Sequence, residues 1–167
     1  MRRQRRTEPA ELVVDKVILE TPEDTMAFGR ALGAVLRAGD LVLLDGPLGA
    51  GKTTLTRGIA DGLGVGGRVS SPTFVLARVH AAGAAGVPLI HVDAYRLGGD
   101  LTQLDDLDLD TDLESSAVVV EWGEGSAERL SEDHLVVRLT RRDDDTRTVV
   151  LEPHGSWTDR VDELQAA

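Results

Sequence analysis

The 167-residue sequence contains no cysteine and no asparagine, and it has only two lysines. Without cysteine, the chain can form neither a disulfide nor a thiolate metal site. Its apolar runs are too short to span a membrane, and no signal-peptide core follows the basic residues at its start. The fractions of hydrophobic and charged residues are ordinary for a globular protein. We therefore expect a cytoplasmic, single-domain protein that contacts no membrane.

Positive charge is also scarce, since the formal net charge is −11. Four arginines lie within the first six residues, so the rest of the chain carries −15 (−11 − 4). A body this acidic repels phosphodiester backbones, which disfavours tight, direct binding of DNA or RNA. We expect residues 1–10 to form a basic, disordered arm and residues 11–167 to form the single folded domain.

Segments of strand and helix character alternate after the arm. Strands are expected at residues 13–20, 41–44, 74–80, 88–92, 117–120, 134–140 and 147–151. Helices are expected after the capping residue Thr21, at residues 53–63 and at residues 156–165, and the aspartate-rich residues 101–113 suggest short helical pieces. The first helix should stop at Gly39. Its buried face should consist of Met26, Ala27, Leu32, Val35 and Leu36.

This alternation predicts an α/β sandwich. The polar turn at residues 143–145 predicts a C-terminal antiparallel hairpin, which makes the sheet mixed.

Residues 46–53, with the sequence Gly-Pro-Leu-Gly-Ala-Gly-Lys-Thr, have the form of a phosphate-binding loop (P-loop). The loop lies between an expected strand and an expected helix, which is the context that this motif requires. Its glycines let backbone N–H groups turn toward bound phosphates. Lys52 can reach the phosphates, and the Thr53 hydroxyl can coordinate Mg²⁺. The motif therefore predicts a three-layer P-loop NTPase-type sandwich with a mixed, mainly parallel central sheet.

Two acids, Asp93 and Glu121, end apolar strands. Ligand sites of parallel α/β sheets lie beyond the carboxyl ends of the strands, so both side chains can project toward bound Mg²⁺. A nucleotide-hydrolysing enzyme needs one such carboxylate for the metal and can use another to position the attacking water. The pattern leaves open which acid has which role.

Other segments near the loop are less specific. The hydroxyl-rich residues 70–74 suit either a γ-phosphate sensor or an ordinary turn. Arginines near the hairpin, at positions 138, 141, 142 and 147, could contact phosphate or a partner, but arginines on an exposed hairpin are more often solvated. Guanine-specific switches use an Asn-Lys-x-Asp motif, which a chain without asparagine cannot form, so adenine is the favoured base.

Four motifs together resemble the bacterial TsaE family, the ATPase component of the tRNA threonylcarbamoyladenosine machinery. They are Gly-Pro-Leu-Gly-Ala-Gly-Lys-Thr-Thr at 46–54, Ser-Pro-Thr-Phe at 71–74, His-Val-Asp-Ala-Tyr-Arg-Leu at 91–97, and Val-Val-Glu-Trp at 119–122. The resemblance covers residues 20–152. Pro47 and Gly123 depart from the residues common in the family, but neither removes a group that the mechanism needs.

The resemblance implies a P-loop ATPase that binds ATP and Mg²⁺ and resets a synthase built from TsaB-type and TsaD-type subunits. That synthase installs threonylcarbamoyl on adenosine 37 of tRNAs that read codons beginning with A, so this chain would meet tRNA only indirectly. The implied catalytic residues are Lys52, Asp93 and Glu121, and the implied metal contacts are Thr53, Asp93 and Glu121. The expected nucleotide contacts are Gly46, Leu48, Gly49, Ala50, Gly51, Lys52, Thr53, Thr54, Pro22, Thr25, Thr73, Trp122, Thr146 and Arg147.

Two other functions fit the loop. A small-molecule kinase of similar length is possible, although it needs an acceptor pocket and an arginine-bearing lid that the sequence does not show. An ATP-sensing protein that does not hydrolyse the nucleotide would keep Lys52 and Thr53 but would not need Asp93.

Overall fold

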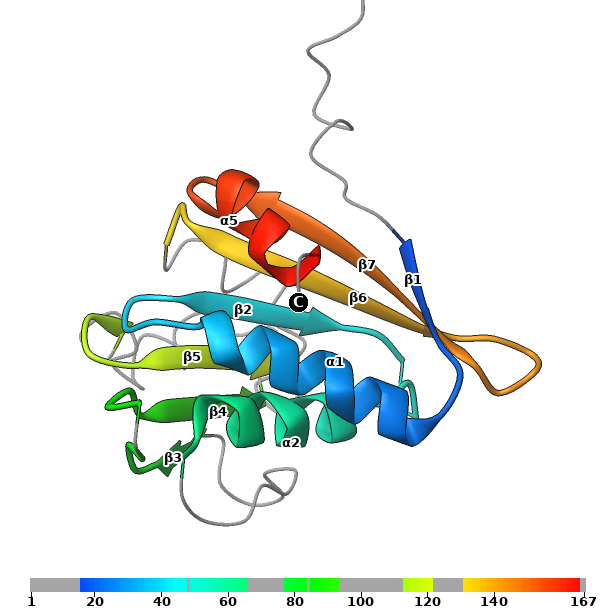
Figure 1. The fold of residues 1–167 in the computed structure, drawn as a ribbon, viewed down its shortest axis with the longest axis horizontal. Helices are drawn as coiled ribbons and strands as arrows, with labels where there is room; N and C mark the ends of the chain where they lie inside the picture. The colour runs from blue at the N-terminus through cyan, green and yellow to red at the C-terminus, as the bar shows by residue number, and fades with distance from the viewer. Residues whose placement is uncertain are drawn as a thin grey trace, which may run out of the picture.

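The computed structural model describes residues 16–47, 49–65, 77–83, 85–93, 113–121 and 131–165. Their strands form one seven-stranded sheet with the order β1-β7-β6-β2-β5-β4-β3 (Figure 1). The strands are β1 (Lys16–Leu19), β2 (Leu41–Asp45), β3 (Ala77–His80), β4 (Leu89–Asp93), β5 (Ala117–Glu121), β6 (His134–Arg141) and β7 (Arg147–His154). The predicted α/β class and the C-terminal hairpin, β6–β7, are confirmed.

The sheet is mixed, as predicted, and it is partly rather than mainly parallel, since three of its six strand pairings are parallel. The four central strands, β6, β2, β5 and β4, are parallel to one another. The remaining three pairings, β1 with β7, β7 with β6 and β4 with β3, are antiparallel. The parallel part is therefore confined to the centre, where β2, β4 and β5 are almost entirely buried. Strands covered on both faces are continuously apolar, which explains why these three could be recognised in the sequence.

Three helices, α1 (Pro22–Val35), α2 (Lys52–Leu63) and α5 (Trp157–Gln165), lie over one face of the sheet (Figure 1). The predicted second helical layer lies outside the described residues. So do residues 101–112, where short helical pieces were expected, and residues 74–76, the start of the strand predicted at 74–80. Among the described residues, the helices are too short or too polar to cross a membrane.

Helix α1 begins as predicted and ends earlier than predicted. The Thr21 hydroxyl accepts a hydrogen bond from the Asp24 amide, and the Asp24 carboxylate accepts one from the Thr21 amide, which completes a capping box. The helix ends at Val35, four residues before the predicted stop. Gly39, with φ 97°, lies instead in the turn that leads into β2.

The predicted apolar face of α1 is confirmed in part, and the contact of α1 with α2 is made through glycine. Leu32 and Leu36 are buried in the core and Val35 packs against it, whereas Met26 is half-buried and Ala27 is exposed. Gly29 and Gly33 are also buried. A Cβ atom at Gly29 would lie 2.5 Å from the Leu55 carbonyl oxygen of α2. Gly58 and Gly62 of α2 are crowded in the same way by the backbone of α1. The two helix backbones therefore touch, and this close approach fixes the start of α1 next to the start of α2.

Helix α5 closes the other end of the same face. Its Trp157 is fully buried, and the Arg160 guanidinium lies 4.0 Å from the centre of the Trp157 ring. Arg160 also donates to both carboxylate oxygens of Asp40, which precedes β2, and to the Val35 carbonyl at the end of α1. This largely buried ion pair fastens α5 to the α1–β2 connection, far along the sheet from the glycine-rich loop (Figure 1).

Candidate functional site

The glycine-rich loop leaves β2 at Asp45 and enters α2 at Lys52, so the predicted order of strand, loop and helix is confirmed. Gly51 caps α2 with φ 106°, a conformation that side-chain-bearing residues rarely adopt. The Lys52 ammonium turns back over the loop and donates to the carbonyl oxygens of Gly46, at 2.5 Å, and Pro47, at 3.0 Å. The loop is thereby closed around its own lysine.

Lys52 lies in an acidic environment. Its side chain is 5% exposed, and this burial lowers the pKa of the ammonium below the ordinary 10.5. The negative charges of Glu121, Asp45 and Asp93 act in the opposite direction and favour the charged lysine. The acids at the ends of three neighbouring strands thus lie within electrostatic reach of the ammonium.

Asp93 and Glu121 lie side by side at the carboxyl ends of two parallel strands. They are register partners in the β4–β5 pairing, and Glu121 is also paired with Leu44 of β2. Both side chains are buried, with 8% and 4% exposure. Register partners in parallel strands point to the same face, and this face is the one covered by α2, because Leu44 belongs to the core cluster that includes Leu55.

The residues present suit Mg²⁺. The ion prefers oxygen ligands and usually binds one or two carboxylates together with substrate phosphates. Asp93 and Glu121 can supply carboxylates, and Thr53, in the first turn of α2, can supply a hydroxyl. Within the described part of the chain, no three His, Asp or Glu side chains are grouped to hold a metal by themselves.

His91 was not singled out from the sequence, although it belongs to the His-Val-Asp motif. Its side chain is fully buried, and its Nε2 atom lies 2.5 Å from Oε2 of Glu121. Its Nδ1 atom has no hydrogen-bond partner among the described residues. The signal that could have identified it is its spacing, since a residue two positions before Asp93 in a strand points to the same face.

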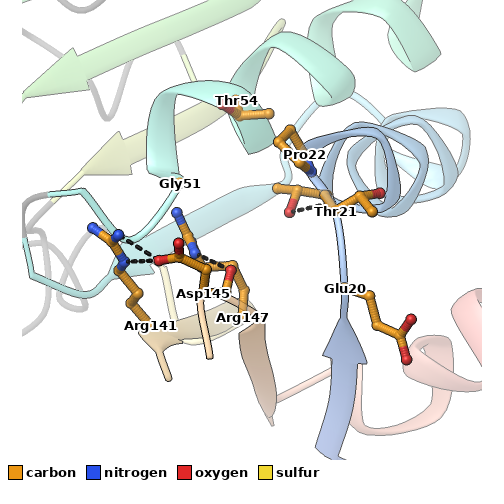
Figure 2. A pocket seen from close by; sticks show the side chains of 9 residues that line it. Glu20, Thr21, Pro22, Gly51, Thr54, Arg141, Asp145 and Arg147 are labelled. Carbon is orange, nitrogen blue, oxygen red and sulfur yellow. Dashed lines mark hydrogen bonds and ion pairs between the residues drawn. The ribbon is translucent and has the colours of Figure 1, made fainter. Parts of the chain in front are cut away.

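A pocket of about 320 Å³ adjoins the loop, within the size range of small-ligand sites (Figure 2). The start of α1, the start of α2 and the β6–β7 turn each contribute to its wall. The lining residues are Glu20, Thr21, Pro22, Thr25, Gly51, Thr54, Arg141, Asp145 and Arg147.

Two of the hairpin arginines face this pocket, so the interpretation that they are merely solvated does not describe Arg141 and Arg147. Arg147 donates to the carbonyl oxygens of Ala50, at 3.0 Å, and Gly49, at 3.2 Å, and thereby ties the hairpin to the loop. Arg138 points elsewhere and pairs with Asp45 and Glu152.

The structure brings together most of the predicted nucleotide contacts. Pro22, Thr25, Thr54 and Arg147 line the pocket beside the loop. Thr146 does not, because its hydroxyl and amide both donate to Asp144 within the turn. Leu48, Thr73 and Trp122, together with residues 70–74, lie outside the described residues. Two further lining residues, Glu20 and Asp145, were given no role at this site by the sequence analysis, which left Arg141 as either a phosphate contact or a solvated side chain.

Comparisons with known proteins agree with this arrangement. The family model described as "Threonylcarbamoyl adenosine biosynthesis protein TsaE" matches residues 19–149. A Streptomyces coelicolor protein named tRNA threonylcarbamoyladenosine biosynthesis protein TsaE is 62% identical over 119 residues, which cover 71% of this chain and 80% of that protein. A Bacillus subtilis protein of the same name is 37% identical over 136 residues and covers 81% of this chain and 83% of that protein.

A solved structure shares the fold. The crystal structure of Bacillus subtilis YdiB matches with a TM-score of 0.74 and 30% identity, covering 92% of this chain and 95% of that chain. The residues matched by the family model include the glycine-rich loop, Asp93 and Glu121, as well as Arg141 and Arg147. The chain belongs to the TsaE family of tRNA threonylcarbamoyladenosine biosynthesis proteins.

Proposed function

We propose that this protein binds ATP with Mg²⁺ at the glycine-rich loop, hydrolyses it, and uses the hydrolysis to reset a partner synthase in the cytoplasm. The synthase would consist of TsaB-type and TsaD-type subunits and would modify adenosine 37 of tRNAs that read codons beginning with A. The observation that carries the proposal is the placement of Asp93 and Glu121 side by side, within the electrostatic reach of Lys52.

The loop would hold the phosphates through its backbone amides and the N-terminal end of α2. Lys52, which donates to Gly46 and Pro47, would exchange these carbonyl oxygens for phosphate oxygens when nucleotide binds. Phosphate is the stronger acceptor for an ammonium, because the bond joins two charged groups. The lowered pKa of this lysine in the unliganded protein would rise beside the phosphates, since a nearby negative charge favours the charged form.

The two carboxylates would have different roles, one in binding the metal and the other in positioning water. Glu121, held by His91, and the Thr53 hydroxyl would hold Mg²⁺, which supplies charge neutralisation at the phosphates. Asp93 would position the attacking water, because it lies next to Glu121 at the same end of the sheet. Burial of both acids keeps their orientation fixed, which favours hydrolysis over simple binding.

The pocket beside the loop would hold the adenosine. Its walls combine the apolar ring of Pro22 and the methyl-bearing Thr25 and Thr54 with the guanidinium of Arg147. Such a mixture suits a planar, partly polar base. We propose that residues 11–167 form this single ATPase domain and that its acidic surface meets a basic partner surface, rather than the tRNA itself.

Reconstitution of tRNA threonylcarbamoylation over several turnovers, with and without this protein, tests the proposal. We expect slow ATP hydrolysis by the protein alone and faster hydrolysis with the TsaB–TsaD pair. Absence of stimulation by cognate partners would overturn the coupled-ATPase function. A phosphorylated small molecule formed at the expense of ATP would show instead that the protein is a kinase.

The role of Asp93 is tested separately with Asp93→Asn, which keeps the size of the side chain and removes its charge. We expect ATP binding close to that of the unaltered protein and hydrolysis reduced by about 100-fold or more, since loss of a catalytic acid or base costs on this order. Unchanged turnover would place the water-positioning group elsewhere.

A further inference from the structure

Asp145, in the β6–β7 turn, has an unusual backbone conformation. Its φ is +69°, and among the described residues no other non-glycine residue has a positive φ. The turn is closed by hydrogen bonds from the Asp145 amide to the Arg142 carbonyl and from the Arg142 amide to the Thr146 carbonyl. A residue at this place in a three-residue hairpin loop is usually glycine, which adopts a positive φ without a steric penalty. Aspartate adopts a positive φ more readily than most other side chains, so the contacts of its carboxylate decide whether it has a further use.

The Asp145 carboxylate binds Arg141. Its Oδ1 atom accepts from Nε of Arg141, at 2.9 Å, and also from Nη2 (Figure 2). The two side chains are 53% and 73% exposed, and an ion pair this exposed adds little to folding stability. Stability of the fold therefore does not account for the pair.

The pair places Arg141 at the pocket wall, beside the glycine-rich loop. A Cβ atom built on Gly49 would lie 3.9 Å from Nη1 of Arg141. Both Arg141 and Asp145 line the pocket that also contains Gly51 and Thr54. Because Asp145 engages Nε and Nη2, the guanidinium presents its remaining nitrogen, Nη1, along the loop.

Arg147 has less donor capacity left, namely one N–H on each of its two Nη nitrogens. Its three nitrogens donate to the carbonyl oxygens of Ala50, Gly49 and Asp145. Nη1 of Arg141, in contrast, has no hydrogen bond to the described residues, so it can donate to a ligand. Of the two arginines in the pocket, Arg147 holds the loop and Arg141 is available to the nucleotide.

We propose that Arg141 is a nucleotide-binding residue whose Nη1 donates to the polyphosphate, and that Asp145 is the residue that positions it. The inference rests on the proposed function, because it assumes a nucleotide in this pocket. A guanidinium suits the task, since it remains charged and binds phosphate oxygens through a rigid, planar donor set.

Equilibrium binding of ATP, ADP and adenosine to Arg141→Ala tests the first part. We expect affinity for ATP and ADP to fall by about 10-fold, as expected for loss of a hydrogen bond to a charged group, and affinity for adenosine to stay the same. Arg142→Ala is the matched control, because Arg142 belongs to the same turn but lines a separate hollow with Asp143 and Asp144 rather than this pocket. An equal loss for all three ligands, or no loss for any, would overturn the proposed phosphate contact.

Asp145→Gly and Asp145→Asn test the second part. Both remove the carboxylate, glycine also removes the steric penalty of the positive φ, and asparagine keeps the size of the side chain. We expect Asp145→Gly to raise the melting temperature and both variants to weaken ATP binding by about 3-fold, because Arg141 loses its orientation. A residue with a purely structural role would not shift stability and affinity in opposite directions, so unchanged ATP affinity in both variants would overturn the positioning role.

These outcomes are distinguishable from failure of the proposed function. If the unaltered protein does not bind ATP, or if Lys52→Met binds it equally well, the nucleotide site itself is wrong. If ATP binds and depends on Lys52 but not on Arg141, only the present inference fails.

Discussion

The imidazole Nε2 of His91 lies 2.5 Å from Oε2 of Glu121, and both side chains are buried. The two residues come from neighbouring parallel strands, β4 and β5, on the face covered by α2. The hydrogen bond engages one carboxylate oxygen and thereby fixes the orientation of the whole carboxylate. This restricts the geometry in which the other oxygen can bind a metal. His91 is therefore expected to position Glu121 without touching the nucleotide.

Replacement of His91 by leucine should remove this hydrogen bond while keeping an apolar group in the core. We expect Mg²⁺-dependent ATP hydrolysis to fall by about 10- to 100-fold, the usual effect of losing a partner of a metal ligand. His91→Gln is the control, since its amide can donate to Glu121 from nearly the same place. Hydrolysis measured against Mg²⁺ concentration should show a weaker metal dependence in the leucine variant and a largely restored one in the glutamine variant. Equal activity of both variants would contradict the positioning role.

Lys52→Met should abolish stabilisation by the nucleotide while leaving the stability of the fold nearly unchanged. Without nucleotide the melting temperature should change little, because two lost hydrogen bonds are offset by removal of a buried charge whose pKa burial lowers. Saturating MgATP at 100 times its dissociation constant should stabilise the unaltered protein by about 2.7 kcal/mol and the variant by almost nothing. Thermal unfolding with and without MgATP measures both effects. The exposed Arg57, on the same helix, provides Arg57→Met as a control that should keep the full stabilisation.

Gly33→Ala should disrupt the crossing of α1 and α2. A Cβ atom at this position would collide with the Ile59 carbonyl oxygen of α2, which is backbone and cannot turn away. We expect the free energy of unfolding to fall by about 3 kcal/mol, at the upper end of overpacking effects, even though alanine has the better helix propensity. Urea unfolding measures the change. Ala27→Leu, which adds more atoms at an exposed position of α1, should alter stability by only about 0.5 kcal/mol.

The crossing also shows why part of the fold could not be predicted. Glycines within a helical pattern suggest weak helix rather than close contact. Their meaning appears only when Gly29 lies opposite Gly58 and Gly33 lies against the Ile59 backbone. The strands β2, β4 and β5 could be predicted because burial on both faces leaves a local apolar run. The early end of α1 at Val35 could not, because Leu36 continues the apolar pattern while its backbone is already extended.

The residues of the candidate site also include some that could be predicted from the sequence and others that could not. Asp93 and Glu121 were identifiable because the end of each strand is a local signal, and their pairing follows from parallel strand order. Arg141 and Asp145 were not, because their role depends on a turn conformation and on the distance from the hairpin to the loop. Arginines are common on hairpins, and no sequence signal distinguishes Arg141, which lines the pocket, from Arg142, which does not.

Glu152→Gln should destabilise the protein at neutral pH by on the order of 1 kcal/mol, the scale of a partly exposed, hydrogen-bonded ion pair. Glu152 of β7 accepts two hydrogen bonds from Arg138 of β6, which lower the pKa of its carboxyl below the ordinary 4.5 despite partial burial. A lowered folded-state pKa means that the unfolded chain binds more protons, so this stabilisation is fully present above pH 4.5 and is lost as the pH falls through the folded-state pKa. The difference in unfolding free energy between the unaltered protein and Glu152→Gln should therefore be constant from pH 7 to about pH 5 and shrink below it. Urea unfolding in steps across this range measures it, with Glu163→Gln, at an exposed ion pair with Arg37, as the control that should change little at any pH. A difference that grows toward acid would contradict the stabilising role of the Arg138–Glu152 pair.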